Sequence, residues 1–309
     1  MSKIITLTLN PALDKSIAVP KLVPEKKLKC SHLIVEPGGG GINVSRAIHK
    51  LGGSSEAVYL SGGYTGKRFE ALLCSENIVS TALPISGDTR ENFIVLDESV
   101  DLQYRFGVEG PGVNKAEWLQ VLQYISKQDD ISYIVASGSL PPGVPVDIFG
   151  QLAIIAKQKN AKLVVDTSGE ALQHAVNEGV FLIKPNLAEL SSLYEKEKLV
   201  QEEIITAAKT IIAKGGCEIM VISMGAEGAM LVTASEIFQV KPPAVTIHST
   251  VGAGDSMVAG IILALYNGWG LKEALYYGVA AGTAATLNAG TELCKKEDTE
   301  RIFAQLKQE

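Results

Sequence analysis

Short apolar runs alternate with longer stretches of helical periodicity along most of the chain. Short runs rich in β-branched residues predict buried strands, and the amphipathic stretches between them predict helices. This alternation is typical of βαβ units in a mostly parallel sheet covered on both faces, with ligands bound at the carboxyl ends of the strands. The predicted strands are Ile4–Leu9, Ala57–Leu60, Tyr133–Ala136, Leu163–Asp166, Phe181–Lys184 and Ile219–Ser223. The predicted helices are Ile42–Leu51, Phe69–Glu76, Lys115–Lys127, Val146–Lys159, Leu187–Tyr194 and Ile204–Lys214.

Two segments interrupt this rhythm, at about residues 12–36 and 86–108. In both, polar and apolar residues alternate between turn signals, as in Lys15-Ser-Ile-Ala-Val, and no helical period is present. They predict extra antiparallel strands that pair into a small sheet apart from the main one. At roughly 150 residues per domain, the 309 residues suggest about two domains or one large α/β unit with an elaboration. The inserted strands account for the length without a second full domain.

Composition and charge narrow the class of protein. Hydrophobic residues make up 46% of the chain and charged residues 20%, which is enough to bury a large core. The 28 Lys+Arg and 34 Asp+Glu give a net charge of −6, which argues against nucleic acid or an anionic membrane as the main partner. The longest uncharged apolar run, Met257–Tyr266, is too short to span a bilayer and predicts a buried helix. The scattered cysteines and the absence of a signal-peptide pattern predict a cytoplasmic protein with reduced thiols.

Glycine is over-represented, with 30 residues, and the densest cluster is Gly38–Gly41 followed by Ile42 and Asn43. Glycines before a helix let the backbone approach a ligand closely and aim free N–H groups at it. Asn43, in the first turn, could bind a hydroxyl. The alternative is a flexible glycine-rich loop, but the run opens directly into an amphipathic helix, which favours ligand binding.

A second cluster, Gly252-Ala253-Gly254-Asp255, precedes the predicted buried helix. A helix N-terminus carries partial positive charge and unpaired amides, so these residues could form a pocket for a developing anion. Asp255 could accept a proton from a substrate hydroxyl there, or it could cap the helix. The two roles are compatible, but a cap needs no Gly-Ala-Gly before it, which favours the catalytic role.

A third motif, Lys184-Pro-Asn186-Leu-Ala-Glu189, follows a predicted strand. An amide and a carboxylate three residues apart suit Mg²⁺, which keeps several waters, and Lys184 could bind a phosphate. The same spacing equally suits a helix capping box, and spacing alone does not decide between them. The usual nucleotide motifs are missing: Arg68 replaces the final Ser/Thr of a P-loop-like segment, and no G-x-G-x-x-G follows the first strand. A dinucleotide-dependent oxidoreductase is therefore disfavoured.

Taken in order, these motifs resemble those of the ribokinase-like (PfkB) family of carbohydrate kinases along the whole chain. The resemblance also rests on Thr8-Leu-Asn-Pro-Ala-Leu-Asp14 and Ser137-Gly-Ser-Leu-Pro-Pro-Gly143. It implies one kinase domain over residues 1–309, a three-layer α/β/α sandwich with a mostly parallel sheet. The segments 12–36 and 86–108 would form a β-sheet lid that closes the sugar site and makes a homodimer interface.

The resemblance also implies a role for each motif in an ATP-dependent phosphoryl transfer. Asp255 is the expected base, and Gly252, Ala253 and Gly254 form the expected anion hole. The expected sugar-phosphate contacts are Asp14, Gly38, Gly39, Asn43, Arg90 and Ser139. The expected contacts to Mg-ATP are Lys184, Asn186, Ser223 and Gly225, with Glu189 organising Mg²⁺. A monovalent cation such as K⁺ would lie at Ser249, Val251, Ala285, Asn288 and Gly290, mostly on backbone oxygens.

Within the family, several segments are most similar to kinases that convert fructose 6-phosphate to fructose 1,6-bisphosphate in glycolysis. Among them are Glu36-Pro-Gly-Gly-Gly-Gly-Ile-Asn and Gln103-Tyr-Arg-Phe. Tagatose-6-phosphate kinases and 1-phosphofructokinases are the alternatives, and they typically carry lysine where this chain has Gly40. A non-catalytic sugar- or nucleotide-binding regulator is the alternative from another class. Asp255 and the intact anion-hole motif disfavour it.

Overall fold

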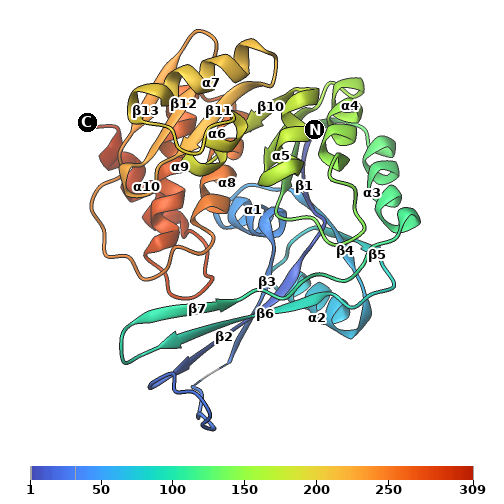
Figure 1. Cartoon of the computed structure of the whole chain (residues 1–309), viewed down its shortest axis with the longest axis vertical. Helices are drawn as coiled ribbons and strands as arrows, with labels where there is room; N and C mark the ends of the chain where they lie inside the picture. Colours follow the sequence, from blue (N-terminus) through green and yellow to red (C-terminus); the bar gives the residue numbers. More distant parts are fainter. Residues whose placement is uncertain (1, 32, 309) are drawn as a thin grey trace.

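A nine-stranded sheet forms the centre of the main body, in the order β13-β12-β11-β10-β9-β8-β1-β4-β5 (Figure 1). The computed structural model describes residues 2–31 and 33–308, so position 32 of the predicted 12–36 segment lies outside them. The strands from β5 to β11 pair in parallel, and β12 and β13 add an antiparallel edge. The bounds are β1 (Lys3–Thr8), β4 (Glu56–Ser61), β5 (Ser80–Pro84), β8 (Ile131–Ser137), β9 (Lys162–Asp166), β10 (Val180–Ile183), β11 (Cys217–Ser223), β12 (Ala229–Val232) and β13 (Ile237–Val240).

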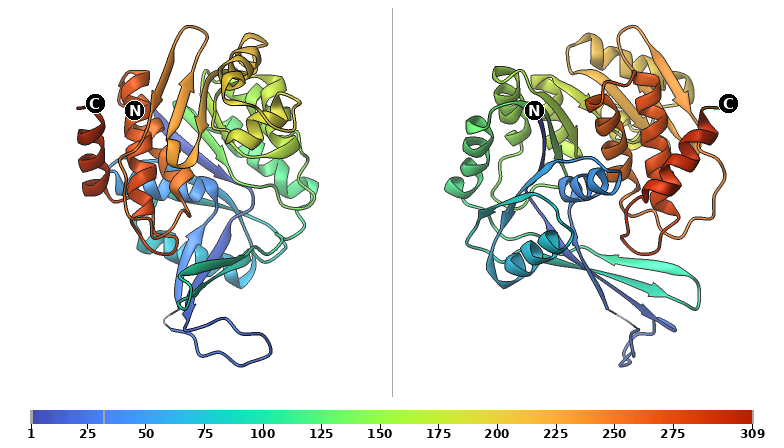
Figure 2. Two further views of the ribbon diagram at one scale, coloured as in Figure 1. Left: turned by 60° about the vertical axis from the view of Figure 1, so that its left-hand side comes forward. Right: turned by 180° about the vertical axis from the view of Figure 1, so that it is seen from behind.

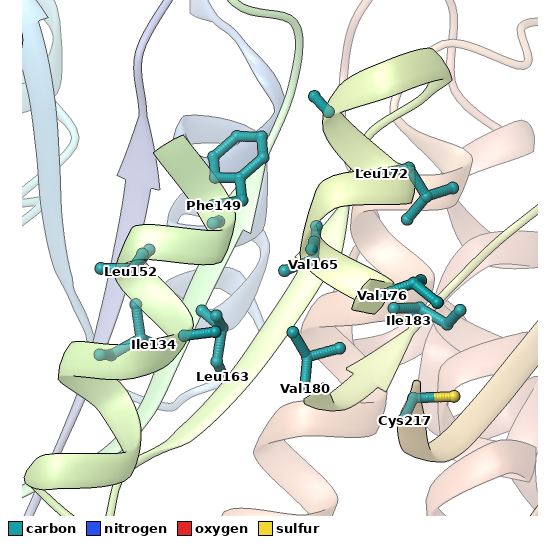
Figure 3. Close-up of a cluster of buried hydrophobic side chains, with 14 of the residues drawn as sticks. Ile134, Phe149, Leu152, Leu163, Val165, Leu172, Val176, Val180, Ile183 and Cys217 are labelled. Carbon is teal, nitrogen blue, oxygen red and sulfur yellow. The ribbon is translucent and has the colours of Figure 1, made fainter. Parts of the chain in front are cut away.

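Helices cover both faces of this sheet because its strands are apolar on both sides. Along β11, Met220 and Ile222 pack into one core and Ile219 and Val221 into the other. The first core lies under α3 (Lys115–Lys127), α4 (Ile148–Gln158), α5 (Gly169–Glu178), α6 (Leu187–Leu193) and α7 (Ile204–Ala213). Figure 3 shows part of it, with Phe149 and Leu152 of α4 and Leu163 of β9 among the labelled side chains. The second core lies under α1 (Gly40–Lys50), α8 (Ala253–Tyr266), α9 (Leu271–Thr286) and α10 (Lys296–Leu306).

The three-layer α/β/α architecture predicted from the sequence is therefore confirmed. Each predicted strand and helix is present, with ends that differ by a few residues, and α2 (Gly63–Ser75) begins earlier than expected. The structure adds β5, β12, β13, α5, α9 and α10, which the sequence pattern did not predict. Within the described residues, no helix combines the length and the apolar character that crossing a bilayer requires.

A second, four-stranded sheet extends from the main body (Figure 1). We call it the small sheet: β3 (Ile34–Gly38), β2 (Ala12–Val19), β6 (Arg90–Asp97) and β7 (Leu102–Phe106), in that order. The outer pairs are antiparallel, but the central strands β2 and β6 pair in parallel, so the expectation of antiparallel strands throughout was wrong. The reason is that β2 follows β1 and β6 follows β5, and those two strands already run in one direction within the main sheet.

The two faces of the small sheet differ in polarity. Tyr104 and Phe106 of β7 are exposed on one face, where Phe106 pairs with the exposed Phe93 of β6. We call this the outer face. Asp14, Asn92 and Arg105 alternate with these residues along their strands and therefore lie on the other, inner face. The outer face thus combines exposed aromatic side chains with the ion pair between Lys15 and Glu91.

Helices α8 and α9 cross at two glycines, and this contact fixes where α8 begins. A Cβ on Gly260 of α8 would lie 3.0 Å from the Cα of Gly278 in α9. A Cβ on Gly278 would overlap Ile261 and lie 2.9 Å from the carbonyl oxygen of Met257. The backbones are therefore in contact, and side chains larger than hydrogen at the crossing push α8 away.

Gly278→Ala is expected to lower the free energy of unfolding by about 1–3 kcal/mol, because overpacking outweighs the better helix propensity of alanine. Thermal unfolding followed by circular dichroism measures the change. Gly112→Ala is the matched control, since a Cβ there meets no atom within 4 Å. Equal unfolding temperatures for the two variants would contradict the proposed contact.

Candidate active site

The glycine run Gly38–Gly41 forms the last residue of β3 and the first turn of α1. Gly39, at the N-cap, has a φ of 117°, a backbone conformation that residues with a side chain rarely adopt. A Cβ on Gly38 would overlap the Asp14 carboxylate, and one on Gly40 would overlap the Ser137 hydroxyl. The run is therefore a closely packed helix start beside Asp14, and the flexible-loop alternative is wrong.

Asp255 lies in the first turn of α8 and faces the start of α1. The N-cap residue of α8 is Gly252, in the left-handed conformation with a φ of 74°, and no side chain caps this helix. The Asp255 carboxylate instead accepts a hydrogen bond from Asn43 Nδ2 at 2.9 Å, across 212 residues of sequence. Asp255 therefore does not cap α8.

The electrostatic surroundings of Asp255 weaken its acidity. Burial raises the pKa of Asp255 to about 6, and the nearby Asp166 carboxylate adds to the rise. The hydrogen bond from Asn43 and the charge of Lys184 oppose it. A pKa of about 6 leaves the carboxylate ionised at neutral pH but able to take up a proton.

Lys184 is a buried cation held against the start of α8. Its Nζ lies 3.2 Å from Asp166 Oδ1, and a Cβ on Gly254 would be 3.4 Å from the same Nζ. Burial alone would lower the pKa of Lys184, but the carboxylates of Asp166, Asp255 and Glu189, with Asp166 the strongest, together raise it. Lys184 therefore stays charged beside the amides at residues 252–254.

The ends of β10 and β11 place the four predicted nucleotide contacts together. Asn186, just past β10, forms a parallel bridge with Ser223, the last residue of β11, and Ser223 N donates to Pro185 O at 3.0 Å. A cavity of about 560 Å³ opens beside them, lined by Ser223, Gly225, Gly254, Met257 and Val279, among others. Its size is that of a small-molecule site, and its mostly apolar lining suits a flat ring.

Asn186 and Glu189 form a complete capping box at the start of α6. Asn186 N donates to Glu189 Oε2 and Glu189 N donates to Asn186 Oδ1, each at 2.9 Å. The capping alternative is thus realised, which does not prevent Glu189 from also approaching a metal. Among the residues that the structure describes, no group of three or more His, Cys, Asp or Glu side chains could hold a metal ion alone.

The predicted sugar-phosphate contacts gather around Asp14 at the base of the small sheet. Asn92 Nδ2 donates to Asp14 Oδ1 at 2.9 Å, and burial raises the pKa of Asp14. Arg90 donates to Val108 O at 2.8 Å and to Asn10 O at 3.0 Å. Asn10 Nδ2 donates to the Ser139 hydroxyl at 3.1 Å. Arg90 Nε and Asn10 Oδ1 are buried without a hydrogen-bond partner within the described chain.

The positions predicted for a monovalent cation also converge. Ser249 Oγ donates to Gly290 O at 2.7 Å and accepts from Val251 N at 3.2 Å, which ties the loop before α8 to the segment after α9. Asn288 N donates to Ala285 O at 3.2 Å, and its side chain donates to Leu293 O at 3.0 Å. These contacts order the backbone of both segments.

Asp166 and Asn10 are site residues that the sequence analysis missed. Asp166 ends a predicted strand, which could have marked it, but its role depends on Lys184 from the next strand. Asn10 belongs to the motif that ends at Asp14, where only the aspartate was selected.

Comparisons with known proteins agree with this geometry. A family model described as pfkB family carbohydrate kinase matches residues 7–298. The chain is 43% identical to ATP-dependent 6-phosphofructokinase isozyme 2 of Escherichia coli K12, over 99% of each chain. It is 32% identical to 1-phosphofructokinase of Borreliella burgdorferi, over 99% of this chain and 98% of that one.

Solved structures give the same result. The crystal structure of Escherichia coli phosphofructokinase-2 in complex with potassium has a TM-score of 0.96, at 42% identity, and covers 99% of this chain and all of that one. A structure described as the tetrameric inhibited form of the same enzyme has a TM-score of 0.94 over the same shares, also at 42% identity.

Asn43→Leu removes the hydrogen bond that lowers the pKa of Asp255, so this pKa is expected to rise above about 6. The carboxylate then takes up its proton at higher pH than in the wild type. A ¹³C NMR titration measures the shift, with the resonance assigned by its loss in Asp255→Asn. Asn177→Leu on the exposed side of α5 is the control, and an identical Asp255 titration in Asn43→Leu would contradict the assigned interaction.

Proposed function

The chain belongs to the pfkB family of carbohydrate kinases, and from this premise we propose that it phosphorylates fructose 6-phosphate with ATP to give fructose 1,6-bisphosphate. The observation that carries the proposal is the position of Asp255, which is bonded to Asn43 on the sugar side and flanked by Lys184 on the nucleotide side. The relative that is 43% identical to this chain is named ATP-dependent 6-phosphofructokinase isozyme 2, after this activity. The product is an intermediate of glycolysis, so the proposed location is the cytoplasm.

In the proposed reaction, Asp255 orients the hydroxyl at O1 of the sugar and accepts its proton. A bond forms between O1 and the γ-phosphorus of ATP, and the bond from that phosphorus to the bridging oxygen breaks, so that ADP leaves with the electron pair. Charge accumulates on the three oxygens of the transferring group. The amides of Gly252, Ala253 and Gly254 donate to these oxygens, and Lys184 adds a positive charge.

The sugar phosphate would bind at the base of the small sheet. We assign its contacts to Asp14, Gly38, Gly39, Asn43, Arg90 and Ser139. Asp14 and Asn43 suit sugar hydroxyls because one accepts and the other donates, and the unpartnered Arg90 Nε suits an anionic group. The small sheet would then act as a lid, with its polar inner face toward the sugar.

ATP would occupy the cavity at the ends of β10 and β11, with contacts at Lys184, Asn186, Ser223 and Gly225. An ATP-dependent kinase also needs a metal ion, and we propose Mg²⁺ with Glu189 as its protein partner. Glu189 fits because Mg²⁺ is held by one or two carboxylates together with waters and phosphate oxygens, so a larger cluster is not needed. When bound, Mg²⁺ neutralises charge on the phosphates.

A monovalent cation would bind beside the anion hole, at Ser249, Val251, Ala285, Asn288 and Gly290. The support is the ordered backbone of these segments and the relative's structure described as a complex with potassium. Carbonyl and hydroxyl oxygens are suitable ligands for such a hard cation. Its charge would strengthen the field at the start of α8.

We further propose that two copies associate through the outer face of the small sheet. Phe93, Leu102, Tyr104 and Phe106 are exposed there, which a monomer in water would not favour. The relative described as a tetramer in its inhibited form shows that larger assemblies occur in the family.

Wild-type protein assayed with Mg-ATP is expected to have its highest kcat/KM with fructose 6-phosphate, above tagatose 6-phosphate and fructose 1-phosphate. Asp255→Asn should lower kcat by about 10²–10⁴-fold, the usual contribution of a general base. Its unfolding temperature at pH 8 should not fall, because the charged carboxylate is disfavoured in the fold, as its raised pKa indicates.

Other outcomes would contradict separate parts of the proposal. If kcat/KM is highest with tagatose 6-phosphate or fructose 1-phosphate, the proposed substrate is wrong. If Asp255→Asn turns over at the wild-type rate, Asp255 is not the base. Binding of sugar and nucleotide without turnover would make the protein a regulator.

Glu189→Gln is expected to raise the Mg²⁺ concentration for half-maximal activity, with little change in the KM for fructose 6-phosphate. Glu117→Gln is the control for loss of a cap alone, because Asn114 and Glu117 form the same kind of capping box at the start of α3. A lower unfolding temperature in both variants with an unchanged Mg²⁺ titration would leave Glu189 a capping residue only.

A further inference from the structure

Glu36 lies on the inner face of the small sheet, two residues before the glycine run Gly38–Gly41. It pairs with Asp14 across β3 and β2, so the two carboxylates lie on the same face. Like charges directly opposite on paired strands repel each other, and the charge of Glu36 contributes to the raised pKa of Asp14. A carboxylate at this position costs stability unless other groups compensate for it.

The first group that compensates for Glu36 is Arg46 of α1, whose guanidinium is buried. Arg46 Nη2 lies 3.2 Å from Glu36 Oε1, and Arg46 Nε and Nη2 each donate to Glu76 at 2.7 Å. Arg46 Nη1 donates to Pro37 O at 2.9 Å, at the peptide bond that leads into Gly38. Arg46 therefore joins the end of β3, the glycine run and α1 into one unit.

The second group that compensates for Glu36 comes from the main body. Thr291 Oγ1 donates to Glu36 Oε2, across 255 residues of sequence, and Thr291 is buried. Thr291 lies in the loop between α9 and α10. Figures 1 and 2 show this loop on the side of the main body from which the small sheet extends. The Glu36 carboxylate thus bridges the small sheet and the main body.

A second strand of the small sheet meets the same loop. Ser16 of β2 alternates with Asp14 along the inner face, and its buried hydroxyl has no hydrogen-bond partner in the part of the chain that the structure describes. A Cβ on Gly290 would lie 3.9 Å from this hydroxyl. Gly290 O accepts from Ser249 Oγ at 2.7 Å, which ties the loop to the segment before α8. The small sheet is therefore placed against the backbone that leads into the helix of Asp255.

Given the proposed kinase function, on which this inference rests, we propose that Glu36 and Thr291 are positioning residues for the sugar phosphate. Their hydrogen bond holds the small sheet against the loop between α9 and α10, and Arg46 fixes Gly38 relative to Glu36. The bond forms only when the small sheet is closed, so it favours the conformation that binds the sugar. Neither side chain is assigned a contact with the reacting atoms or with ATP.

The first test measures kcat and the KM values for fructose 6-phosphate and Mg-ATP in the full-length protein. Thr291→Val should raise the KM for fructose 6-phosphate about 10-fold, the effect of losing a hydrogen bond to a charged group, with little change in kcat or in the KM for Mg-ATP. Thr291→Ser should restore the wild-type KM because it keeps the hydroxyl. Thr210→Val is the matched control, since the Thr210 hydroxyl bonds only within α7, to Thr206 O.

Glu36→Gln tests the same bond from the small sheet. It removes the charge and keeps the size, so it should also raise the KM for fructose 6-phosphate, which tests the inference even if Thr291→Val does not fold. In the Glu36→Gln background, Thr291→Val should cause a smaller additional loss than in the wild type, because both changes weaken one interaction. The comparison isolates the contact, since the effect of Glu36→Gln on Asp14 is present in both backgrounds.

Hydrogen exchange followed by mass spectrometry measures the position of the small sheet without catalysis. In Thr291→Val, the amides of β3 and of residues 288–292 should exchange faster than in the wild type, and saturating fructose 6-phosphate should restore their protection. Peptides from α4 should exchange as in the wild type, whereas a general loss of stability would speed exchange there as well.

Four results would overturn the inference: a KM for fructose 6-phosphate that neither Thr291→Val nor Glu36→Gln changes, an equal loss in Thr291→Ser, an equal effect of Thr291→Val in both backgrounds, or a loss confined to kcat. A wild type without kinase activity would instead remove the proposed function, and the exchange measurement would still test the contact between Glu36 and Thr291.

Discussion

The hydrogen bond between Asn43 and Asp255 joins the first turns of α1 and α8, and the organisation of the site depends on it. Both helices start at glycines with left-handed or tightly packed backbones, so their amides open toward the same cleft. In the proposed function, α1 lies on the sugar side and α8 on the phosphoryl side. The position of α8 depends in turn on its contact with α9 at Gly260 and Gly278. A backbone contact far from the cleft thus sets where the proposed base lies.

The second constraint is the concentration of like charge around this bond. Asp166 and Asp14 both raise the pKa of Asp255, and Lys184 lies beside Asp166. Holding ionised carboxylates together in a partly dry site costs stability, and the raised pKa of Asp255 expresses that cost. Asp255 remains mostly ionised at neutral pH, but its raised pKa makes it a stronger proton acceptor than an exposed aspartate. The same surroundings require compensating cations once phosphate oxygens enter.

Much of the fold could be predicted because its strands are buried on both faces and its amphipathic helices have clear periods. The pattern failed where burial removes the period: α9 is buried on nearly all sides and rich in Ala and Gly. The strands β12 and β13 form an antiparallel edge with no helix between them, so they lie outside the strand–helix alternation on which the prediction was based. The parallel pairing of β2 with β6 joins segments more than 70 residues apart, which no local signal encodes.

The residues of the site also divide into those that the sequence predicted and those that it did not. Glycine runs and Asp255 were visible because each combines an unusual residue with a helix start. The alternatives at Asn186 and Glu189 could not be separated by spacing, and the structure contains the capping bonds in full. Asp166 and Asn10 were not selected, since each matters through a partner from another part of the chain, Lys184 and Ser139. Pairwise geometry of this kind is a property of the fold and not of any one segment.

The opposite polarity of its two faces makes the small sheet a single body that takes part in two equilibria. Its inner face carries Asp14 and Arg105, and its outer face carries Phe93 and Phe106. If closing the sheet favours both contacts, a molecule that covers the outer face changes the affinity for the sugar by some factor. Thermodynamic linkage then requires the sugar to change the affinity of that outer contact by the same factor. Protein concentration would thereby become a variable of substrate binding, without any dedicated effector site.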